Sequence, residues 1–525
     1  MAKNEGTLRS WMPAPAAFLT ITLAALVLAI YLLRLDRIAG LIVDDAWYVL
    51  FAQALARGEG YSLVNAPTPG ILPAYPPGFS AILSLVFRLS PTFPENVLLL
   101  KAVSIVAMMT LGVASHQYFR HRKLPRQLAI ALAVAVVITP AFVFLATSTV
   151  MSECVFTLMQ LLVITLVDRS VAATHPRRDT LLAGALAAAA VLIRTAGAAM
   201  LVAVMLYLLK CRRWRHASLF AIMVLLCLAP WWWYARTHAP TRQERMAHGG
   251  SQSFTYSEAF WMRWAGESTA GVITMRDLPA RVEDRLVDVF GRDVAGIVAP
   301  TLFRSAFESG EEVISVGGGL FPGSMGIATG TVLVSYLFSA VALLGFVSTI
   351  RRGASSAEFM VPLSIALIVV WPWPAYRFVL PLTPYLFFYL LAGLQTMTRA
   401  LPVARVALLC VIGLNVADHV QYILESRTAT LDWAANAQEI DALLDWMRHH
   451  VTGDGYVATT NPALVHLRTG RRTVAIDDPA ANWQRWKSMG VRYLVCLVPG
   501  QPPPADGPYK ELYRSGSHGL WVVEI

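Results

Sequence analysis

Charged residues are scarce in this chain, and their scarcity indicates the class of protein. Only 14% of the 525 residues are Asp, Glu, Lys or Arg, whereas a soluble domain has about 25%. Hydrophobic residues make up 56%, and apolar runs long enough to cross a bilayer recur along most of the sequence. The pattern excludes a soluble enzyme and predicts an α-helical polytopic membrane protein.

Cysteine pairs, metal-binding motifs and nucleotide-binding motifs are also missing. The five cysteines form no CxxC pair and most lie in or beside apolar runs, so neither a disulfide framework nor a zinc site is expected. The sequence has no P-loop, no Asp-x-Asp motif, no convincing GxGxxG and, within the spans, no His-x-x-x-His. These absences disfavour a metalloprotease and an enzyme that binds a soluble nucleotide sugar.

Basic residues cluster in short loops between the apolar runs, which argues against nucleic-acid binding despite a net charge of +10. One alternation of about 11 spans leaves every such loop in the cytoplasm together with the N-terminus. The stretch Gly78–Leu89 has 12 residues, or roughly 18 Å of helix, so we expect it to lie at the interface or to re-enter instead of spanning. The expected spans are residues 15–33, 97–119, 127–146, 149–167, 179–193, 196–210, 217–236, 328–350, 358–372, 376–397 and 402–423.

This topology divides the chain into a membrane domain and an outer tail. The membrane domain, residues 1–428, includes a first outer loop at 36–96 and a large, polar outer loop at 237–327 that contains a run of three glycines. The tail, residues 429–525, combines an amphipathic helix at Ala437–His450 with short β-like runs, which predicts a small α/β domain outside the cytoplasm. The β-like runs are residues 456–459, 473–476, 493–498 and 520–525.

Two adjacent carboxylates, Asp44 and Asp45, follow the first span. The apolar residues after them recur at helical spacing on one face, from Trp47 to Leu55, and Gly58 is placed to end the helix. Because this helix is too short to span, we expect it to lie along the interface, with Trp47 and Tyr48 at headgroup depth.

The remaining ionisable residues near the outer ends of the spans come from separate segments, and their convergence indicates a site. Each also has a structural interpretation. Asp45 could cap the helix that follows it, and Glu153 could compensate a helix dipole. Arginine and lysine side chains at helix ends often reach toward the interface, which is what we expect of Lys101. The candidate set is Asp44, Asp45, Glu153, Arg194 and Arg377.

Carboxylates and arginines at a membrane surface suit the transfer of a group from a lipid-linked phosphate to a hydroxyl. The acceptor hydroxyl is a weak nucleophile and needs a carboxylate base. The departing phosphate needs cations, and the planar fork of an arginine matches its oxygens.

At these residues the sequence resembles the GT-C type glycosyltransferases. It is most similar to the branch that holds bacterial lipopolysaccharide-core and lipid A sugar transferases, which is related to the protein O-mannosyltransferases. The resemblance covers nearly the whole chain, although each motif is short. The motifs are Asp44–Tyr48, Ala54–Gly58, Tyr75–Gly78, Val150–Glu153, Leu192–Arg194, Arg377–Pro381, Leu444–Met447 and Leu467–Arg471.

The resemblance implies a polyprenyl-phosphate sugar donor and inversion at the anomeric carbon. It makes Asp44 the essential acid of the first outer loop, Asp45 its neighbour and Glu153 the acid of the second outer loop. Arg377, with Arg194, would hold the donor phosphate. Residues lining the substrate pocket would be Tyr48, Tyr75, Pro76 and Pro77.

The sequence departs from its relatives at Ala74–Tyr75, where the aminoarabinose and O-mannosyl branches place a lysine or histidine before the paired prolines. Some relatives bind a divalent metal ion near the first-loop acid; in this chain that ligand would be Asp44.

We therefore expect an inverting glycosyltransferase of the bacterial inner membrane, with its site and C-terminal tail in the periplasm. Its acceptor would be the hydroxyl of a lipid, glycan or protein. Two alternatives stay open on sequence alone: a transporter or lipid flippase, and a non-catalytic membrane scaffold. The sequence disfavours a transporter, because the centres of the spans are nearly uncharged.

Overall fold

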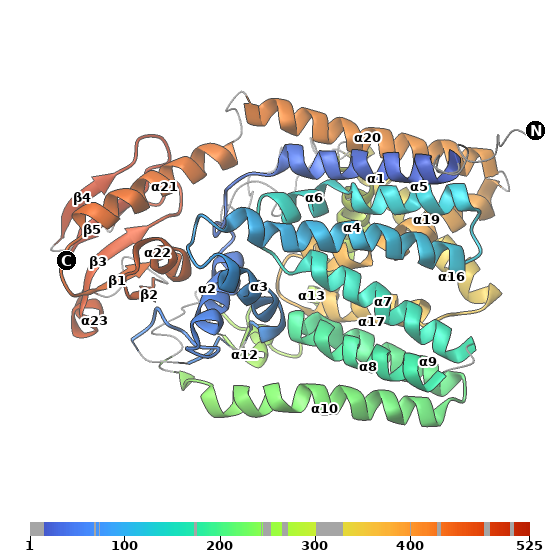
Figure 1. Cartoon of the computed structure of the whole chain (residues 1–525), viewed down its shortest axis with the longest axis horizontal. Helices are drawn as coiled ribbons and strands as arrows, with labels where there is room; N and C mark the ends of the chain where they lie inside the picture. Colours follow the sequence, from blue (N-terminus) through green and yellow to red (C-terminus); the bar gives the residue numbers. More distant parts are fainter. Residues whose placement is uncertain are drawn as a thin grey trace, which may run out of the picture.

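Long helices lie side by side along the longest axis of the molecule, and a small sheet stands at one end of them (Figure 1). The computed structural model describes residues 15–67, 70–72, 74–172, 176–242, 244, 254–264, 271–300, 329–398, 401–427, 432–476, 483–503 and 509–525. The expected glycine run at 317–319 lies outside these residues, as do other parts of the large outer loop.

The bundle is built from twelve helices within the described residues. They are α1 (Pro15–Arg34), α4 (Val97–His121), α5 (Arg126–Val137), α6 (Pro140–Thr147), α7 (Glu153–Ala172), α8 (Pro176–Ile193), α9 (Ala198–Lys210), α10 (Trp214–His238), α16 (Thr329–Arg352), α17 (Ala357–Val370), α19 (Thr383–Thr398) and α20 (Leu401–Arg427). Short elements at the sheet end and in the outer loop are α2 (Asp44–Arg57), α3 (Pro77–Leu89), η1 (Thr195–Gly197), α12 (Tyr256–Trp261), α13 (Leu278–Asp288), η4 (Val289–Asp293), α14 (Val294–Val298), α18 (Tyr376–Val379) and η5 (Leu380–Leu382).

Every expected span coincides with a helix or a helix pair of this bundle. Six described helices are long and apolar enough to cross a membrane, and α5 with α6 makes a seventh that is bent by 51°. Pro140 opens α6 at the bend, where proline cannot continue the hydrogen bonds of the preceding turn. The other four expected spans are shorter or, in α8, begin with charged residues, so the count of 11 stays a prediction.

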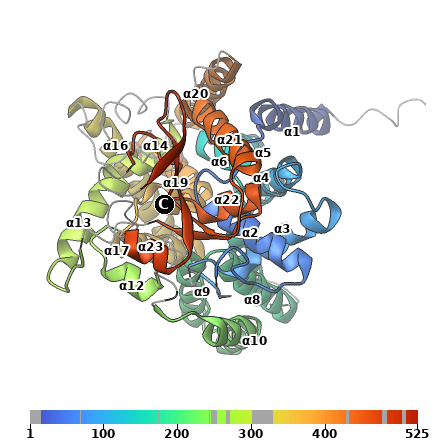
Figure 2. The same cartoon turned by 90° about the vertical axis from the view of Figure 1, so that its left-hand side faces the viewer.

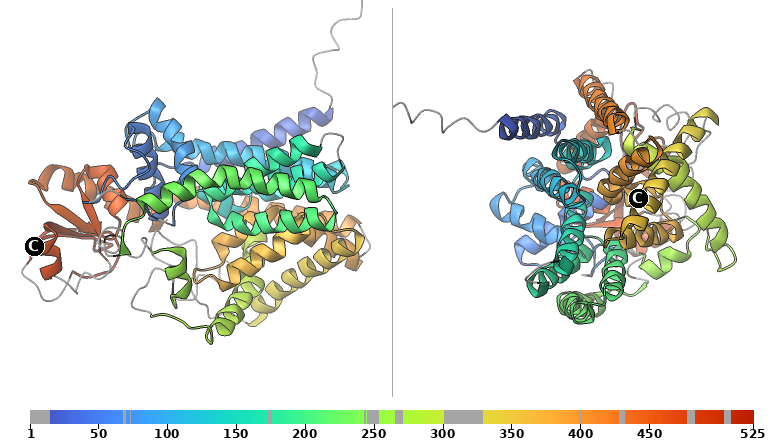
Figure 3. Two further views of the ribbon diagram at one scale, coloured as in Figure 1. Left: turned by 90° about the horizontal axis from the view of Figure 1, so that it is seen from below. Right: turned by 90° about the vertical axis from the view of Figure 1, so that its right-hand side faces the viewer.

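The outward faces of several helices are apolar, as they must be in a bilayer. In the most apolar 18-residue stretch of α10, only 22% is buried inside the protein. The corresponding share is 28% in α16 and in α20. Trp233 and Leu409 are among the exposed side chains. In the end-on views the helices are grouped around the long axis of the molecule (Figure 2 and the right panel of Figure 3), and buried side chains from most of them form one hydrophobic cluster. The chain is therefore a multi-pass membrane protein.

Helix α2 is as short as predicted, but it is buried from Asp45 to Ala54 instead of exposing a polar face. Trp47 is fully buried and Tyr48 nearly so, so both side chains pack inside the protein instead of against lipid, and their expected headgroup depth stays a prediction. Helix α3 packs against one side of α2, and α22 (Pro462–Thr469) of the tail packs against another. The amphipathic pattern of the sequence did not indicate that α22 buries a second face of α2.

The tail begins with α21 (Asp432–His450), which includes the predicted helix, and ends in a mixed five-stranded sheet of order β2-β1-β3-β5-β4. The pairs β1–β2 and β1–β3 are parallel, and β3–β5 and β4–β5 are antiparallel. The four predicted β-like runs are strands, and β4 was not predicted. The bounds are β1 (Tyr456–Thr459), β2 (Thr473–Ala475), α23 (Trp483–Ser488), β3 (Val491–Cys496), β4 (Lys510–Arg514) and β5 (Trp521–Glu524).

Candidate active site

Polar side chains from five separate segments meet near the end of the bundle that carries α2 and the sheet. Each lies at a helix terminus or in a short connection. Asp44 opens α2, Tyr75 precedes α3, Glu153 opens α7, Arg194 follows α8 and Arg377 lies in α18. The structure thus brings together the residues that the sequence analysis selected from distant parts of the chain.

Two carboxylates and two guanidinium groups alternate in one connected array. Arg377 donates from Nη2 to Oδ2 of Asp44 at 2.8 Å and from Nε to Oε1 of Glu153 at 2.8 Å. Arg194 Nη1 lies 2.9 Å from the same Oε1 atom and donates to Ser152 Oγ at 3.1 Å. The array is neutral overall, which lowers the cost of placing four charges at the edge of an apolar bundle.

Accessibility divides this array into a buried and an open half. The side chains of Asp44 and Arg377 are 24% and 20% exposed, whereas that of Glu153 is fully buried. The Oε2 atom of Glu153 has no hydrogen-bond partner among the described residues. The buried Glu153 therefore holds both arginines in place, whereas Asp44 and Arg377 are exposed enough to contact a substrate.

Asp45 lies next to Asp44 but faces away from the arginines. Its Oδ2 accepts the Gly40 N–H at 2.7 Å and its Oδ1 accepts the Ala46 N–H at 3.0 Å. The pKa of Asp45 is raised to about 6, mainly by burial and to a lesser extent by the neighbouring Asp44 charge, against the opposing effect of the Gly40 N–H. Asp45 is thus a buried structural carboxylate that supports the turn before α2.

Two tyrosines enclose the open carboxylate. Tyr75 donates its hydroxyl hydrogen to Oδ1 of Asp44 at 2.6 Å, and Ser152 donates to the Tyr48 hydroxyl at 3.3 Å. The rings of Tyr48 and Tyr75 meet edge to face at 5.4 Å. Burial raises the pKa of Tyr48 to about 12 and that of Tyr75 well above its ordinary value, so both hydroxyls stay protonated and can donate.

The paired prolines set the position of Tyr75. Pro76 is the N-cap of α3 and Pro77 is its first residue, where the missing N–H costs nothing. Gly78 then packs so closely on the end of α8 that a Cβ there would lie 2.7 Å from the Leu192 carbonyl oxygen. This approach places the Tyr75 loop beside Arg194.

Tyr256 of α12 and Ser152 belong to the site and were not predicted. The Tyr256 hydroxyl donates to the Ala74 carbonyl at 2.9 Å and accepts from Thr195 Oγ1 at 2.8 Å, so it joins the two loops that carry Tyr75 and Arg194. Nothing in the polar outer loop distinguishes this tyrosine in the sequence. Ser152 directly precedes Glu153, and this position next to a candidate residue was the one feature of the sequence that could have indicated Ser152.

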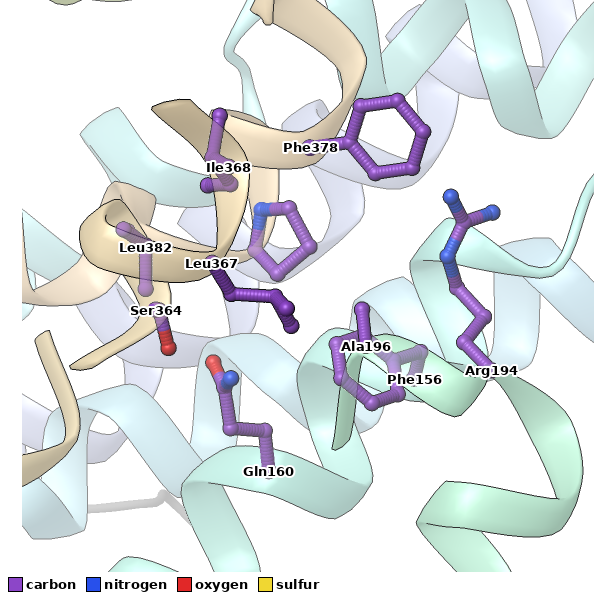
Figure 4. A pocket seen from close by; sticks show the side chains of 10 residues that line it. Phe156, Gln160, Arg194, Ala196, Ser364, Leu367, Ile368, Phe378 and Leu382 are labelled. Atoms are coloured by element: carbon purple, nitrogen blue, oxygen red, sulfur yellow. The ribbon is translucent and has the colours of Figure 1, made fainter. Parts of the chain in front are cut away.

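A narrow pocket lies on the bundle side of Arg194 (Figure 4). Its walls are mostly apolar, and Arg194 Cζ lies 5.6 Å from the centre of the Phe378 ring. The Gln160 side chain points into it, and the Gln160 Oε1 atom is buried with no hydrogen-bond partner in the part of the chain that the structure describes. The pocket is lined by Phe156, Gln160, Arg194, Ala196, Ser364, Leu367, Ile368, Phe378, Pro381 and Leu382.

A divalent metal ion beside Asp44 would need several oxygen or nitrogen ligands that converge on one point. Asp44 and Glu153 instead converge on Arg377. Among the described residues no group of three or more His, Cys, Asp or Glu could hold a metal ion. The surroundings of Asp44 therefore do not fit such an ion, because the guanidinium occupies the space between the two carboxylates.

Comparison with known proteins gives a family match for one segment of the chain and a fold for most of it. Residues 74–275 match the model of glycosyltransferase family 87. A search of the curated proteins returns no match. The apo crystal structure of ArnT from Cupriavidus metallidurans is similar with a TM-score of 0.52 at 14% identity, covering 97% of this chain and 98% of that one.

Two further solved structures are similar at lower scores. ArnT from Cupriavidus metallidurans bound to undecaprenyl phosphate has a TM-score of 0.47 at 12% identity, covering 97% of this chain and 98% of that one. The archaeal oligosaccharyltransferase AglB from Archaeoglobus fulgidus, in complex with an inhibitory peptide and a dolichol-phosphate, has a TM-score of 0.49 at 13% identity, covering 92% and 69%. The resemblance of the motifs is confirmed: this chain has the fold of the GT-C type membrane glycosyltransferases, and its segment 74–275 matches glycosyltransferase family 87.

Proposed function

We propose that this protein transfers a sugar from a polyprenyl-phosphate donor to a hydroxyl of a lipid, glycan or protein acceptor, with inversion, at the periplasmic face of the bacterial inner membrane. One observation carries the proposal. Arg377 joins Asp44 to Glu153 through hydrogen bonds of 2.8 Å each, and the side chains of Asp44 and Arg377 are partly exposed. The array offers a base and a phosphate-binding cation within one hydrogen bond of each other.

On the acceptor side, Asp44 is the base. The acceptor oxygen attacks the anomeric carbon from the face opposite the phosphate, its proton passes to Asp44, and the new carbon–oxygen bond replaces the bond to the phosphate oxygen. Tyr75 stays protonated and holds Oδ1 of Asp44, so Oδ2 is the oxygen that receives the proton. A single displacement of this kind inverts the configuration.

On the donor side, Arg377 and Arg194 receive the phosphate. Its oxygens carry the charge that develops as the carbon–oxygen bond breaks, and guanidinium forks stabilise that charge. When the phosphate binds Arg377, the Nη2 hydrogen bond to Asp44 is given up and the carboxylate becomes available to the acceptor. Glu153 keeps both arginines in place during the exchange.

The same proposal assigns the domains and the sides of the membrane. Residues 1–428 are the membrane domain with its two outer loops, and 429–525 form a periplasmic domain. In support, helix α22 of the tail contacts α2, which carries Asp44, so the tail lies at the end of the bundle where the acid is.

The test is complementation of a strain that lacks the gene. We expect the wild-type protein to restore one sugar to a surface glycan or lipid, measured by mass spectrometry. With Asp44→Asn we expect that sugar to stay missing and the polyprenyl-phosphate sugar to accumulate in the lipid extract.

Glu511→Gln is the matched control, because Glu511 pairs with Arg514 at 2.7 Å on the edge strand β4 of the tail, where both side chains are exposed. It should restore the sugar. Full restoration by Asp44→Asn at equal protein level would refute the proposal.

A further inference from the structure

The turn before α2 is held from two sides. The Asn461 side chain of the tail donates from Nδ2 to the Gly40 carbonyl at 2.7 Å, and the Gly40 N–H donates to Oδ2 of Asp45 at 2.7 Å. Gly40 has φ +90°, and a Cβ at this position would lie 2.6 Å from Leu464 Cδ1 of α22. The tail therefore touches the turn through both a hydrogen bond and close packing that only glycine permits.

The backbone between this turn and Asp44 is strained. Val43 has φ 61° and ψ −55°, and the Asp44 N–H donates to the Ile42 carbonyl at 2.6 Å. Together these define a γ-turn of the rare form with positive φ, which is costly for a β-branched residue. Val43 is also the N-cap of α2, and it supplies no side-chain cap. Strain of this kind persists only when surrounding contacts hold it.

Asp44 is the residue immediately after the strained one. Its carboxylate reaches Arg377 at 2.8 Å and Tyr75 at 2.6 Å only because the first turn of α2 starts in this direction. If the γ-turn relaxed, the start of α2 would rotate and the Asp44 carboxylate would move with it.

Asn461 has two separable roles. Its Oδ1 accepts the Leu464 N–H at 3.2 Å, which caps α22, while its Nδ2 is committed to Gly40. Asn461 is 5% exposed and Leu464 2%, so water does not compete with either contact. A residue needed only to cap α22 would not require the amide nitrogen.

We propose that Asn461 is a positioning residue: the C-terminal tail, through Asn461 and Leu464, holds the Gly40 turn and the strained γ-turn at Val43 and thereby aims Asp44 at Arg377. The inference rests on the proposed function of Asp44. It gives the tail a role in placing Asp44, beyond that of a separate docking module.

The test compares Asn461→Ser with Asn65→Ser in the purified full-length protein. Serine at 461 keeps a cap for α22 but is too short to reach Gly40. Asn65 is the matched control, because its Nδ2 donates to Thr473 Oγ1 of the tail at 2.9 Å and it is also buried, while neither hydrogen bond of this Nδ2 goes to the Gly40 turn.

The assay uses a polyprenyl-phosphate sugar as donor and a membrane-envelope extract as the source of acceptor. We expect Asn461→Ser to lower kcat by at least about tenfold and to leave the donor KM unchanged. The reason is that misplacing a reacting group by about 1 Å can lower the rate by about 100-fold. Asn65→Ser should lower the unfolding temperature similarly and leave kcat within about twofold of wild type. A wild-type kcat for Asn461→Ser, or equal losses in the two variants, would overturn the positioning role. If Asp44→Asn kept full activity, the proposed function itself would fail, and the two failures are therefore distinguishable.

Discussion

Arg377 is the residue on which the geometry of the proposed site depends, because its guanidinium is shared by two carboxylates from different helices. Its Nε and Nη2 atoms point to Glu153 and Asp44 respectively. A lysine would keep the positive charge but offers one ammonium in place of a planar fork. The arrangement therefore needs arginine, and charge alone should not replace it.

We predict that Arg377→Lys lowers kcat/KM for the donor by about 100-fold, which is the usual cost of removing one donor that stabilises a developing oxyanion. Steady-state transfer by the purified protein measures it. Arg37→Lys, a conservative change at an exposed arginine of the α1–α2 connection, is the control. A variant with lysine at 377 and undiminished kcat/KM would show that the fork is dispensable.

Asp45 predicts a pH dependence of stability. Its pKa is raised to about 6 in the folded protein by burial, whereas it is about 3.9 in an unfolded chain. The folded state therefore binds the proton more tightly, so the stabilisation is complete below about pH 4 and is lost as the pH rises through about 6.

Between pH 8 and pH 5 the wild-type protein should gain about 1 kcal/mol of stability relative to Asp45→Asn. Thermal unfolding of both proteins across this pH range measures the difference. A constant difference between the two proteins would mean that Asp45 is not buried as a carboxylate.

Lys101 shows where reasoning at the level of single residues stops. From the sequence we expected its side chain to reach the interface, but it is fully buried. Its Nζ donates to Oδ1 of Asp36 at 2.6 Å and to the Thr147 carbonyl at 2.8 Å, which ties α4 to the α1–α2 connection and to the end of α6. The position of Lys101 in the sequence indicated that it lies near the end of a helix. The carboxylate that it pairs with became evident only from the packing of the neighbouring segments.

Among the elements, α4, α17 and α19 are joined by a buried ionic cluster. Arg122, the C-cap of α4, donates to Oε1 of Glu358 in α17 at 2.8 Å, and the Tyr389 hydroxyl of α19 donates to the same oxygen at 2.9 Å. Glu358 is 4% exposed. Breaking a buried pair leaves an uncompensated charge, so the cluster should matter for stability and not for the transfer reaction.

Glu358→Ala should therefore destabilise the protein by about 3–5 kcal/mol while the folded fraction retains its kcat. Thermal unfolding and activity per folded molecule measure the two parts. Arg120→Ala is the control, because exposed Arg120 of the same helix end donates to the nearby Leu124 carbonyl and takes no part in the buried cluster. A stable variant with a reduced kcat would contradict this assignment.

Hydrophobic periodicity predicted the helices and strands that bury one face. It missed features that depend on contacts with segments distant in the sequence. Strand β4 lies at the edge of the sheet with half-exposed or exposed side chains, so Lys510–Arg514 carries little apolar signal. In α2, the second buried face is covered by α22, more than 400 positions later in the chain. Tyr256 and Asn461 were missed for the same reason, since both act through contacts with distant segments.

For the whole molecule, the order of apolar runs and basic loops was enough to predict the bundle and its class, and the short β-like runs of the tail predicted the small terminal sheet. The convergence of Asp44, Glu153 and Arg377 also followed from placing helix ends on one side. The distances between them, and the separate roles of Asp44 and Asp45, depend on how the tail and the outer loops pack, and no local pattern encodes that.

The proposed topology predicts that both the tail and the site face the periplasm. A reporter that is active only in the periplasm should be active when fused after Ile525 and silent when fused before Met1. Activity of the N-terminal fusion with silence of the C-terminal one would reverse the topology and place the site in the cytoplasm.

The reaction itself is tested by one comparison between purified wild type and purified Asp44→Asn, each in lipid vesicles. The quantity measured is the rate at which polyprenyl phosphate is released from a polyprenyl-phosphate sugar, with an envelope extract as acceptor. We predict that Asp44→Asn is slower by at least about 100-fold, the range expected for loss of a general base, while its unfolding temperature stays close to that of wild type. Equal rates from two equally folded proteins would contradict the acid–arginine mechanism.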